Sequence, residues 1–187
     1  MFQLFYEAVR NDDIDKFESL LLQFPTLSND IRASKCSQNP LLAALEHGSC
    51  QVGREMGRLW PELASDKNEH GETASHIAAA EGDVEMVQIL GEGYVESCLV
   101  RDSCSMIPLH RAVINGHSDM IRALVSICPE SLESLTSNQD SDLQLAVMNS
   151  QFDAFQVLVN ETKIHGKEHL FQFEKPRRQH CLAPCYV

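Results

Sequence analysis

A segment of the chain recurs at a constant interval of 34 residues, and this periodicity limits the possible folds more than any other feature. The copies are residues 39–48, 73–87, 107–121 and 141–150, and their shared anchors are Ala44, Ala78, Ala112 and Ala146. A further copy around Ala8 lies 36 residues before Ala44, which predicts a two-residue insertion in the connecting loop. Self-similarity at this period predicts a solenoid of stacked units, because one unit alone cannot bury its apolar face.

Each unit is predicted to contain two short helices separated by one left-handed residue. In the best-preserved unit we expect the first helix from Ala74 to Glu81, closed by Gly82 in the left-handed conformation. Val84, Val87 and Leu90 then place an apolar face at helical spacing. The other units have Asp12, Gly48, Gly116 and Ser150 at the closing position. A non-glycine residue there costs up to about 1 kcal/mol unless the turn relaxes.

Three prolines mark the end of the second helix. Pro25, Pro61 and Pro129 each follow their alanine anchor by 17 residues, and proline disfavours continuation of a helix. We therefore expect an all-α repeat solenoid over residues 1–162, followed by a divergent C-terminal tail over 163–187 that is either a cap or disordered. The units are predicted at about 1–33, 34–67, 68–101, 102–135 and 136–162.

Composition excludes several classes of protein. The net charge of −12 argues against binding to a nucleic-acid backbone. Seven cysteines at irregular spacing favour reduced thiols and a cytoplasmic location over a disulfide framework. No apolar run is long enough to span a bilayer, and Glu7 and Arg10 interrupt any signal peptide.

The motifs of the third and fourth units resemble the signature of ankyrin repeats. They are Thr73-Ala74-Ser75-His76-Ile77-Ala78-Ala79 and Pro108-Leu109-His110-Arg111-Ala112. The resemblance covers residues 1–162 and implies an L-shaped stack of about five helix pairs with projecting finger loops. Residues 128–135 and 152–159 resemble plant ankyrin proteins that carry a C-terminal PGG membrane domain, which is absent here after Thr162. That resemblance implies a role in plant immune or stress signalling, with relatives at the plasma membrane.

The family's threonine and histidine, which fasten the loop to the first helix, are both present only as Thr73 and His76. The other units pair Asn39 with Leu42, Ile107 with His110 and Ser141 with Gln144. We therefore expect the second and fifth units to be looser than the third. His76 and His110 are interpreted as structural, because no nucleophile, base or second metal ligand accompanies them.

The resemblance also implies that a partner protein binds the concave face, formed by the finger tips and the outward residues of the first helices. The finger positions are Lys35, Cys36, Gln38, Glu69, His70, Glu72, Ser103, Cys104, Met106, Ser137, Asn138 and Asp140. The helix positions are Glu46, His47, Ala80, Glu81, Ile114, Asn115, Met148 and Asn149. Among them, Met106, Ile114 and Met148 form either an exposed apolar binding patch with a polar rim or part of the core.

No phosphate-binding loop, nucleophile elbow or metalloprotease motif occurs, so we predict a non-enzymatic protein without cofactor or metal. The expected partner is another protein, with no nucleic acid and no membrane span, and the chain is expected to be a monomer. The acidic body either attracts a basic partner or serves solubility.

Two alternative functions stay open. The chain could be a truncated competitor of membrane-anchored relatives. It could also be a metal- or redox-responsive switch in the tail, where His165, His169, His180, Cys181 and Cys185 lie. Leu170, Phe171 and Phe173 could instead cover the end of the stack.

Overall fold

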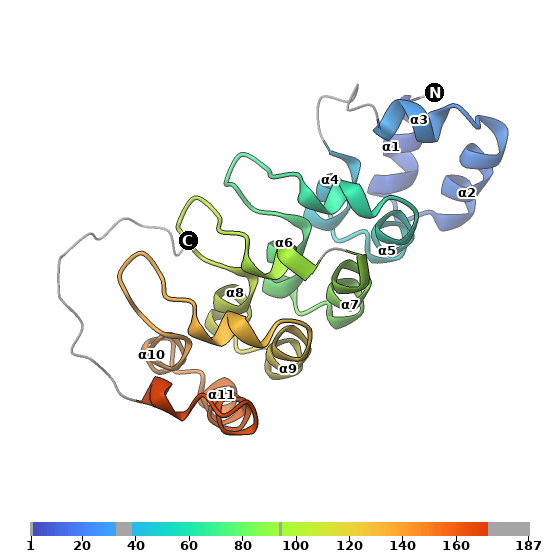
Figure 1. Cartoon of the computed structure of the whole chain (residues 1–187). Helices are drawn as coiled ribbons and strands as arrows, with labels where there is room; N and C mark the ends of the chain where they lie inside the picture. The colour runs from blue at the N-terminus through green and yellow to red at the C-terminus, as the bar shows by residue number, and fades with distance from the viewer. Residues whose placement is uncertain (1, 33–38, 94, 172–187) are drawn as a thin grey trace.

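The computed structural model describes residues 2–32, 39–93 and 95–171 (Figure 1), and within these ranges every regular element is a helix. The α-helices are α1 (Phe2–Arg10), α2 (Ile14–Gln23), α3 (Leu27–Arg32), α4 (Pro40–Glu46), α5 (Cys50–Leu59), α6 (Ala74–Glu81), α7 (Val84–Gly93), α8 (Pro108–Ile114), α9 (Ser118–Ile127), α10 (Asp142–Met148) and α11 (Phe152–Ile164). The 3-10 helices are η1 (Pro61–Ser65), η2 (Val95–Leu99), η3 (Pro129–Glu133) and η4 (Glu168–Phe171).

The α-helices form two parallel rows. The first helices α1, α4, α6, α8 and α10 pack successively on one another, and so do the second helices α2, α5, α7, α9 and α11. The loops that precede α6, α8 and α10 project to the same side of the stack (Figure 1). The predicted all-α repeat solenoid is therefore confirmed.

The predicted left-handed residues are confirmed in every unit. Gly82 closes α6 with φ 78°, and α6 begins and ends at the expected residues. The same conformation occurs, with φ between 51° and 75°, at Asp12, Gly48, Gly116 and Ser150. Asp12 and Ser150 thus adopt a left-handed backbone conformation that favours glycine, and the turn does not relax around either residue.

Each of the three prolines follows the end of a second helix, as predicted. In addition, Pro61 and Pro129 begin the short 3-10 helices η1 and η3, which the sequence analysis did not anticipate. Proline suits this place because its fixed φ matches the first helical residue, where no N–H donor is needed.

Small residues let neighbouring helices approach closely. The anchor alanines are at most 1% exposed and lie where the first helices pack on one another. In the second row, a methyl group added at Gly91 of α7 would lie 2.8 Å from the Cδ1 atom of Ile127 in α9. A side chain at this position would therefore require Ile127 to move.

Polar side chains connect neighbouring units at their helix ends. His117 Nε2 lies 2.9 Å from the Ala80 carbonyl oxygen, and Gln151 Nε2 donates to the Ile114 carbonyl oxygen at 3.0 Å. The carboxylate of Asp12 accepts from Val52 N at 2.9 Å, at the start of α5 in the next unit. These bonds satisfy backbone groups that a helix end leaves without an internal partner.

The fifth unit replaces the threonine–histidine pair with an equivalent one. Ser141 N donates to Gln144 Oε1 at 2.8 Å, and Gln144 N donates to Ser141 Oγ at 3.4 Å. In the second unit, Asn39 Oδ1 accepts from Leu41 N at 2.8 Å. Both helices are capped in spite of the altered motif. A missing cap therefore gives no reason for the second and fifth units to be looser than the third.

Beyond residue 162, α11 continues to Ile164, and η4 follows it. Leu170 and Phe171 of η4 are half-buried against the apolar core. These two residues thus cover part of the end of the stack, while Phe173 lies outside the described residues.

Candidate functional site

Each described finger is closed at its base by a side-chain acceptor. In the finger formed by residues 66–72, Asn68 Oδ1 accepts from His70 N and Glu72 N, both at 3.0 Å. Asp102 and Thr136 have the corresponding role in the fingers 100–106 and 134–140. One left-handed residue per finger completes the turn, at Gly71, Ser105 and Gln139. The loops are consequently ordered by short-range hydrogen bonds.

The repeated histidines fasten the fingers to the helices. His76 Nδ1 accepts from Thr73 N at 3.2 Å, so its proton lies on Nε2, which donates to the Met106 carbonyl oxygen at 3.0 Å. His110 likewise bridges Ile107 N and the Ser134 carbonyl oxygen. Burial lowers the pKa of both rings, in His110 to about 4. The structural interpretation of both histidines is confirmed.

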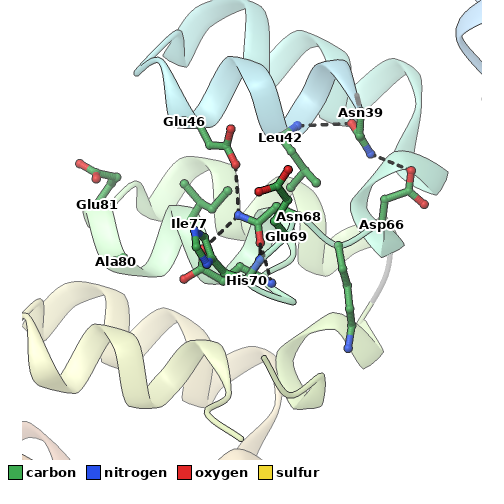
Figure 2. A pocket seen from close by; sticks show the side chains of 12 residues that line it. Asn39, Leu42, Glu46, Asp66, Asn68, Glu69, His70, Ile77, Ala80 and Glu81 are labelled. Atoms are coloured by element: carbon green, nitrogen blue, oxygen red, sulfur yellow. Dashed lines mark hydrogen bonds between the residues drawn. The ribbon is translucent and has the colours of Figure 1, made fainter. Parts of the chain in front are cut away.

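An open pocket of about 990 Å³ lies between the 66–72 finger and the first helices α4 and α6 (Figure 2). Its lining residues are Asn39, Leu42, Glu46, Asp66, Lys67, Asn68, Glu69, His70, Glu72, Ile77, Ala80 and Glu81. The finger supplies most of the polar side chains, while both helices contribute apolar side chains and one carboxylate each. The pocket therefore exists only where two consecutive units meet.

Comparison with known proteins agrees with this architecture. Residues 70–102, which contain the last residues of the 66–72 finger together with α6, α7 and η2, match the family model described as Ankyrin repeat. This segment is therefore similar to an ankyrin repeat. The human "Ankyrin repeat domain-containing protein SOWAHB" is 32% identical to the chain over 104 residues. That match covers 52% of this chain and 13% of the human protein, so the chain spans only a small part of that relative's length.

The pocket gathers four of the predicted partner-binding residues. Glu46, Glu69, His70 and Glu72 all line it. Asn68 joins two of them, because its Nδ2 atom donates to Glu46 Oε1 and Glu72 Oε2, each at 3.1 Å. Ala80 and Glu81 line it as well, as expected of outward residues of the first helix.

The remaining predicted residues do not line this pocket. His47, Ser103, Asn115 and Asn138 are exposed, and Asn149 is half-buried with its Nδ2 atom donating to the Leu145 carbonyl oxygen at 2.8 Å. Ser103 N donates to the His70 carbonyl oxygen at 3.0 Å, which joins neighbouring fingers. Lys35, Cys36 and Gln38 lie outside the described residues.

Of the two alternatives for Met106, Ile114 and Met148, the structure excludes a patch in which all three are exposed. Met106 is 4% exposed, because its N–H donates to Asp102 and its carbonyl accepts from His76, which hold it in the finger base. Ile114 is half-buried, and only Met148 is extensively exposed, at 65%. Asp140, expected at the rim of that patch, is also buried, and its backbone N–H donates to a hydroxyl of its own finger.

The sequence analysis missed Asp66, Asn68, Leu42 and Ile77 as lining residues. Asn68 had a detectable signal, because it precedes Asp102 by one repeat length and Thr136 by two. All three residue types hydrogen-bond readily to the backbone of a turn. Leu42 and Ile77 had no such signal, since an apolar helix residue looks the same in sequence whether it faces the core or a pocket.

The described residues include no group of three or more His, Cys, Asp or Glu side chains that could hold a metal ion. The distance from His165 Nε2 to Glu161 Oε2 is 3.8 Å, and the candidate ligands His180, Cys181 and Cys185 lie outside the described part. Within that part, no helix combines the length and apolar character needed to cross a bilayer.

Proposed function

We propose that the chain is a non-catalytic module that binds another protein at the face where its fingers and first helices meet. The observation that supports this most directly is the pocket shared by the 66–72 finger, α4 and α6. Ankyrin repeats generally mediate protein–protein interaction, which agrees with this use of the surface. Partner binding by Glu46, Glu69, His70 and Glu72 is part of the proposal.

Order within the fingers supports binding without a large entropic cost. Asn68 and Asp102 each hold two backbone N–H groups of their own finger, and His76 bonds one unit to the next. A surface that is ordered before binding loses less conformational freedom when the partner arrives.

Hydrogen bonding of the repeated histidines argues against catalysis at these rings. His76 and His110 have both ring nitrogens directed at backbone groups and are buried. A general base must reach a substrate proton, and neither ring has a free nitrogen for that purpose.

Substitution of Ala80 by tryptophan tests the proposal, because a large side chain there would fill the pocket. Gln88→Trp is the control, since Gln88 is exposed on α7, a second helix, and does not line the pocket. The tagged full chain would capture partners from tissue extract, and a partner identified by mass spectrometry would be purified and titrated. We expect Ala80→Trp to lose binding and Gln88→Trp to keep it; equal binding by both contradicts the proposal.

The proposed pathway is plant immune or stress signalling in the cytoplasm, and it rests on the resemblance of residues 128–135 and 152–159 alone. The identity of the captured partner tests it. Displacement of that partner from a membrane-anchored relative would favour the competitor role. Bound zinc in native mass spectrometry of the full chain would favour the metal switch instead.

A further inference from the structure

We infer that the pocket receives a basic segment of the partner protein, in which Lys or Arg side chains flank an apolar residue. This inference rests on the proposed function and specifies the chemistry of the partner. We call the site the acidic groove and define it by Leu42, Glu46, Asp66, Glu69, Ile77 and Glu81.

Two carboxylates of the groove, those of Glu69 and Glu81, are not neutralised by any described residue. Glu69 and Glu81 are exposed, and neither forms an ion pair or hydrogen bond with any described residue. Lys67 also lines the pocket, but its Nζ atom donates to the Arg101 carbonyl oxygen at 3.0 Å and not to a carboxylate of the lining. Among the acids of the lining, Glu72 does form an ion pair, since Arg111 Nη2 lies 2.9 Å from its Oε1 atom. The groove thus has an excess of negative charge.

Two of the acids occupy positions that are unfavourable for the helices themselves. Glu46 is the last residue of α4 and Glu81 is the last residue of α6. The C-terminal end of a helix carries partial negative charge, so a carboxylate there is repelled, whereas Lys or Arg would be attracted. Local helix stability therefore gives no reason for either acid. Glu46 accepts from Asn68 Nδ2 at 3.1 Å, whereas Glu81 has no such contact with the described residues, and a cationic ligand would account for it.

The floor of the groove is apolar. Leu42 is buried, and Ile77 and Ala80 are half-buried beside the carboxylates. In the view of Figure 2, Glu81 and Asp66 lie at opposite ends of the pocket, with Glu46, Leu42 and Ile77 between them. An extended segment with an apolar side chain toward the floor and cationic side chains toward both ends would match this distribution.

The size of the groove favours a polypeptide segment over a metal ion. Its volume of about 990 Å³ far exceeds that of an ion, and the described residues contain no cluster of metal-ligand side chains there. The chain's own residues Lys175, Arg177 and Arg178 have the same chemistry as the inferred segment, so the experiment must distinguish them from an external partner.

The test uses two short peptides and the full chain. One peptide contains Arg-Leu-Arg within Gly and Ser, and the other replaces both arginines with citrulline, which keeps the shape and removes the charge. We expect calorimetric binding of the arginine peptide only, weakened by added salt. The variant Glu69→Gln/Glu81→Gln should lower its affinity roughly tenfold or more, with a melting temperature no lower than that of the parent chain.

Glu92→Gln/Glu96→Gln is the matched control, because it removes two exposed glutamates that do not line the groove. It should leave the affinity unchanged. Equal binding of both peptides, or equal losses in both double variants, overturns the inference in favour of general attraction to an acidic protein. So does binding that appears only after Lys175, Arg177 and Arg178 are replaced by glutamine, because the occupant is then this chain's own segment.

The outcomes separate this inference from the proposed function. A captured partner that is lost in Ala80→Trp, together with no binding of the arginine peptide, keeps the proposed function and refutes the basic segment. If Ala80→Trp keeps the partner and the arginine peptide does not bind, both the proposed function and the basic segment are refuted.

Discussion

His76 Nε2 lies 3.0 Å from the carbonyl oxygen of Met106, so a helix of one unit holds the base of the following finger. The ring must be neutral, because Nδ1 accepts from Thr73 N and a protonated Nδ1 has no lone pair left to accept with. His110 repeats the arrangement one unit later. The attachment of the fingers is therefore expected to depend on pH.

We expect the free energy of unfolding to decrease as the pH falls from about 6.5 to about 4. Burial lowers the pKa of His110 from 6.5 to about 4, so the folded chain binds fewer protons than the unfolded chain in this window, and acid favours unfolding. The contribution of His110 approaches about 3 kcal/mol at the acid end. Urea unfolding at a series of pH values measures it.

His110→Gln provides the matching variant, since Gln144 already accepts from Ser141 N in the same way. The variant should unfold with a smaller dependence on pH in this window, whereas His70→Gln, at an exposed finger position, should keep the parent's dependence. Identical pH profiles for all three chains would contradict the role given to His110.

Asp142→Pro should stabilise the chain. Both carboxyl oxygens of Asp142 are buried without a hydrogen bond, and His110 Nε2 lies 3.6 Å from Oδ1. Burial raises the pKa of Asp142 well above its usual value. Pro40 and Pro108 occupy the same repeat position, so we expect a gain of about 1–3 kcal/mol at pH 7.

The gain should shrink as the pH approaches about 4. Because the folded pKa of Asp142 is raised, its burial is penalised only above the pKa of the unfolded chain, near 3.9. Chemical unfolding at both pH values measures the difference, with the exposed Glu18→Ala as the control. A loss of stability at pH 7 would show that the carboxyl group has an undetected partner.

Ser150→Gly and Asp12→Gly should have opposite effects, although both residues occupy the left-handed closing position. Glycine relieves the backbone strain at Ser150, with an expected gain of about 0.5–1 kcal/mol. At Asp12 the same relief is outweighed, because its carboxylate accepts from Val52 N at 2.9 Å and Gln51 N at 3.2 Å. Removing these bonds should cost about 1–2 kcal/mol in thermal or urea unfolding. Equal changes in stability for the two variants would show that the carboxylate of Asp12 does not cap α5.

Gly91→Ala should destabilise the chain by about 1–3 kcal/mol, because its methyl group would lie 2.8 Å from Ile127 Cδ1. Combining it with Ile127→Val should recover part of the loss. Gly53→Ala is the control, since its methyl group would lie 3.4 Å from Leu45 Cδ2, which is ordinary contact. This control should be neutral or slightly stabilising. A neutral Gly91→Ala would show that α7 and α9 can separate without cost.

Local backbone features were predictable from the sequence because they depend on single residues and on the repeat period. Glycine at Gly82 identifies a left-handed turn, and the register transfers that conformation to Asp12 and Ser150. Pro61 identifies the end of α5 because it cannot continue the helix. The helix α6 could therefore be placed from residue 74 to residue 81.

The candidate site was predictable only in part. The resemblance to ankyrin repeats implied that Glu46, Glu69 and Glu72 lie on the binding face, and the pocket contains them. The same resemblance placed Met106 there, but the side chain of Met106 is buried. Met106 is held in place by His76, which is distant in sequence, and by Asp102, which reaches it only once the finger has folded. The repeat period carries no information about such contacts.

The sequence by itself determined the period, the helix pairs and the left-handed turns, since each follows from the backbone preferences of a few neighbouring residues. Only the tertiary structure decided that Met106 and Asp142 are buried and that Glu46, from one unit, shares a pocket with Glu69 and Glu81 from the next. Burial and proximity across units depend on how far adjacent helices approach, and that distance is a property of the packed stack.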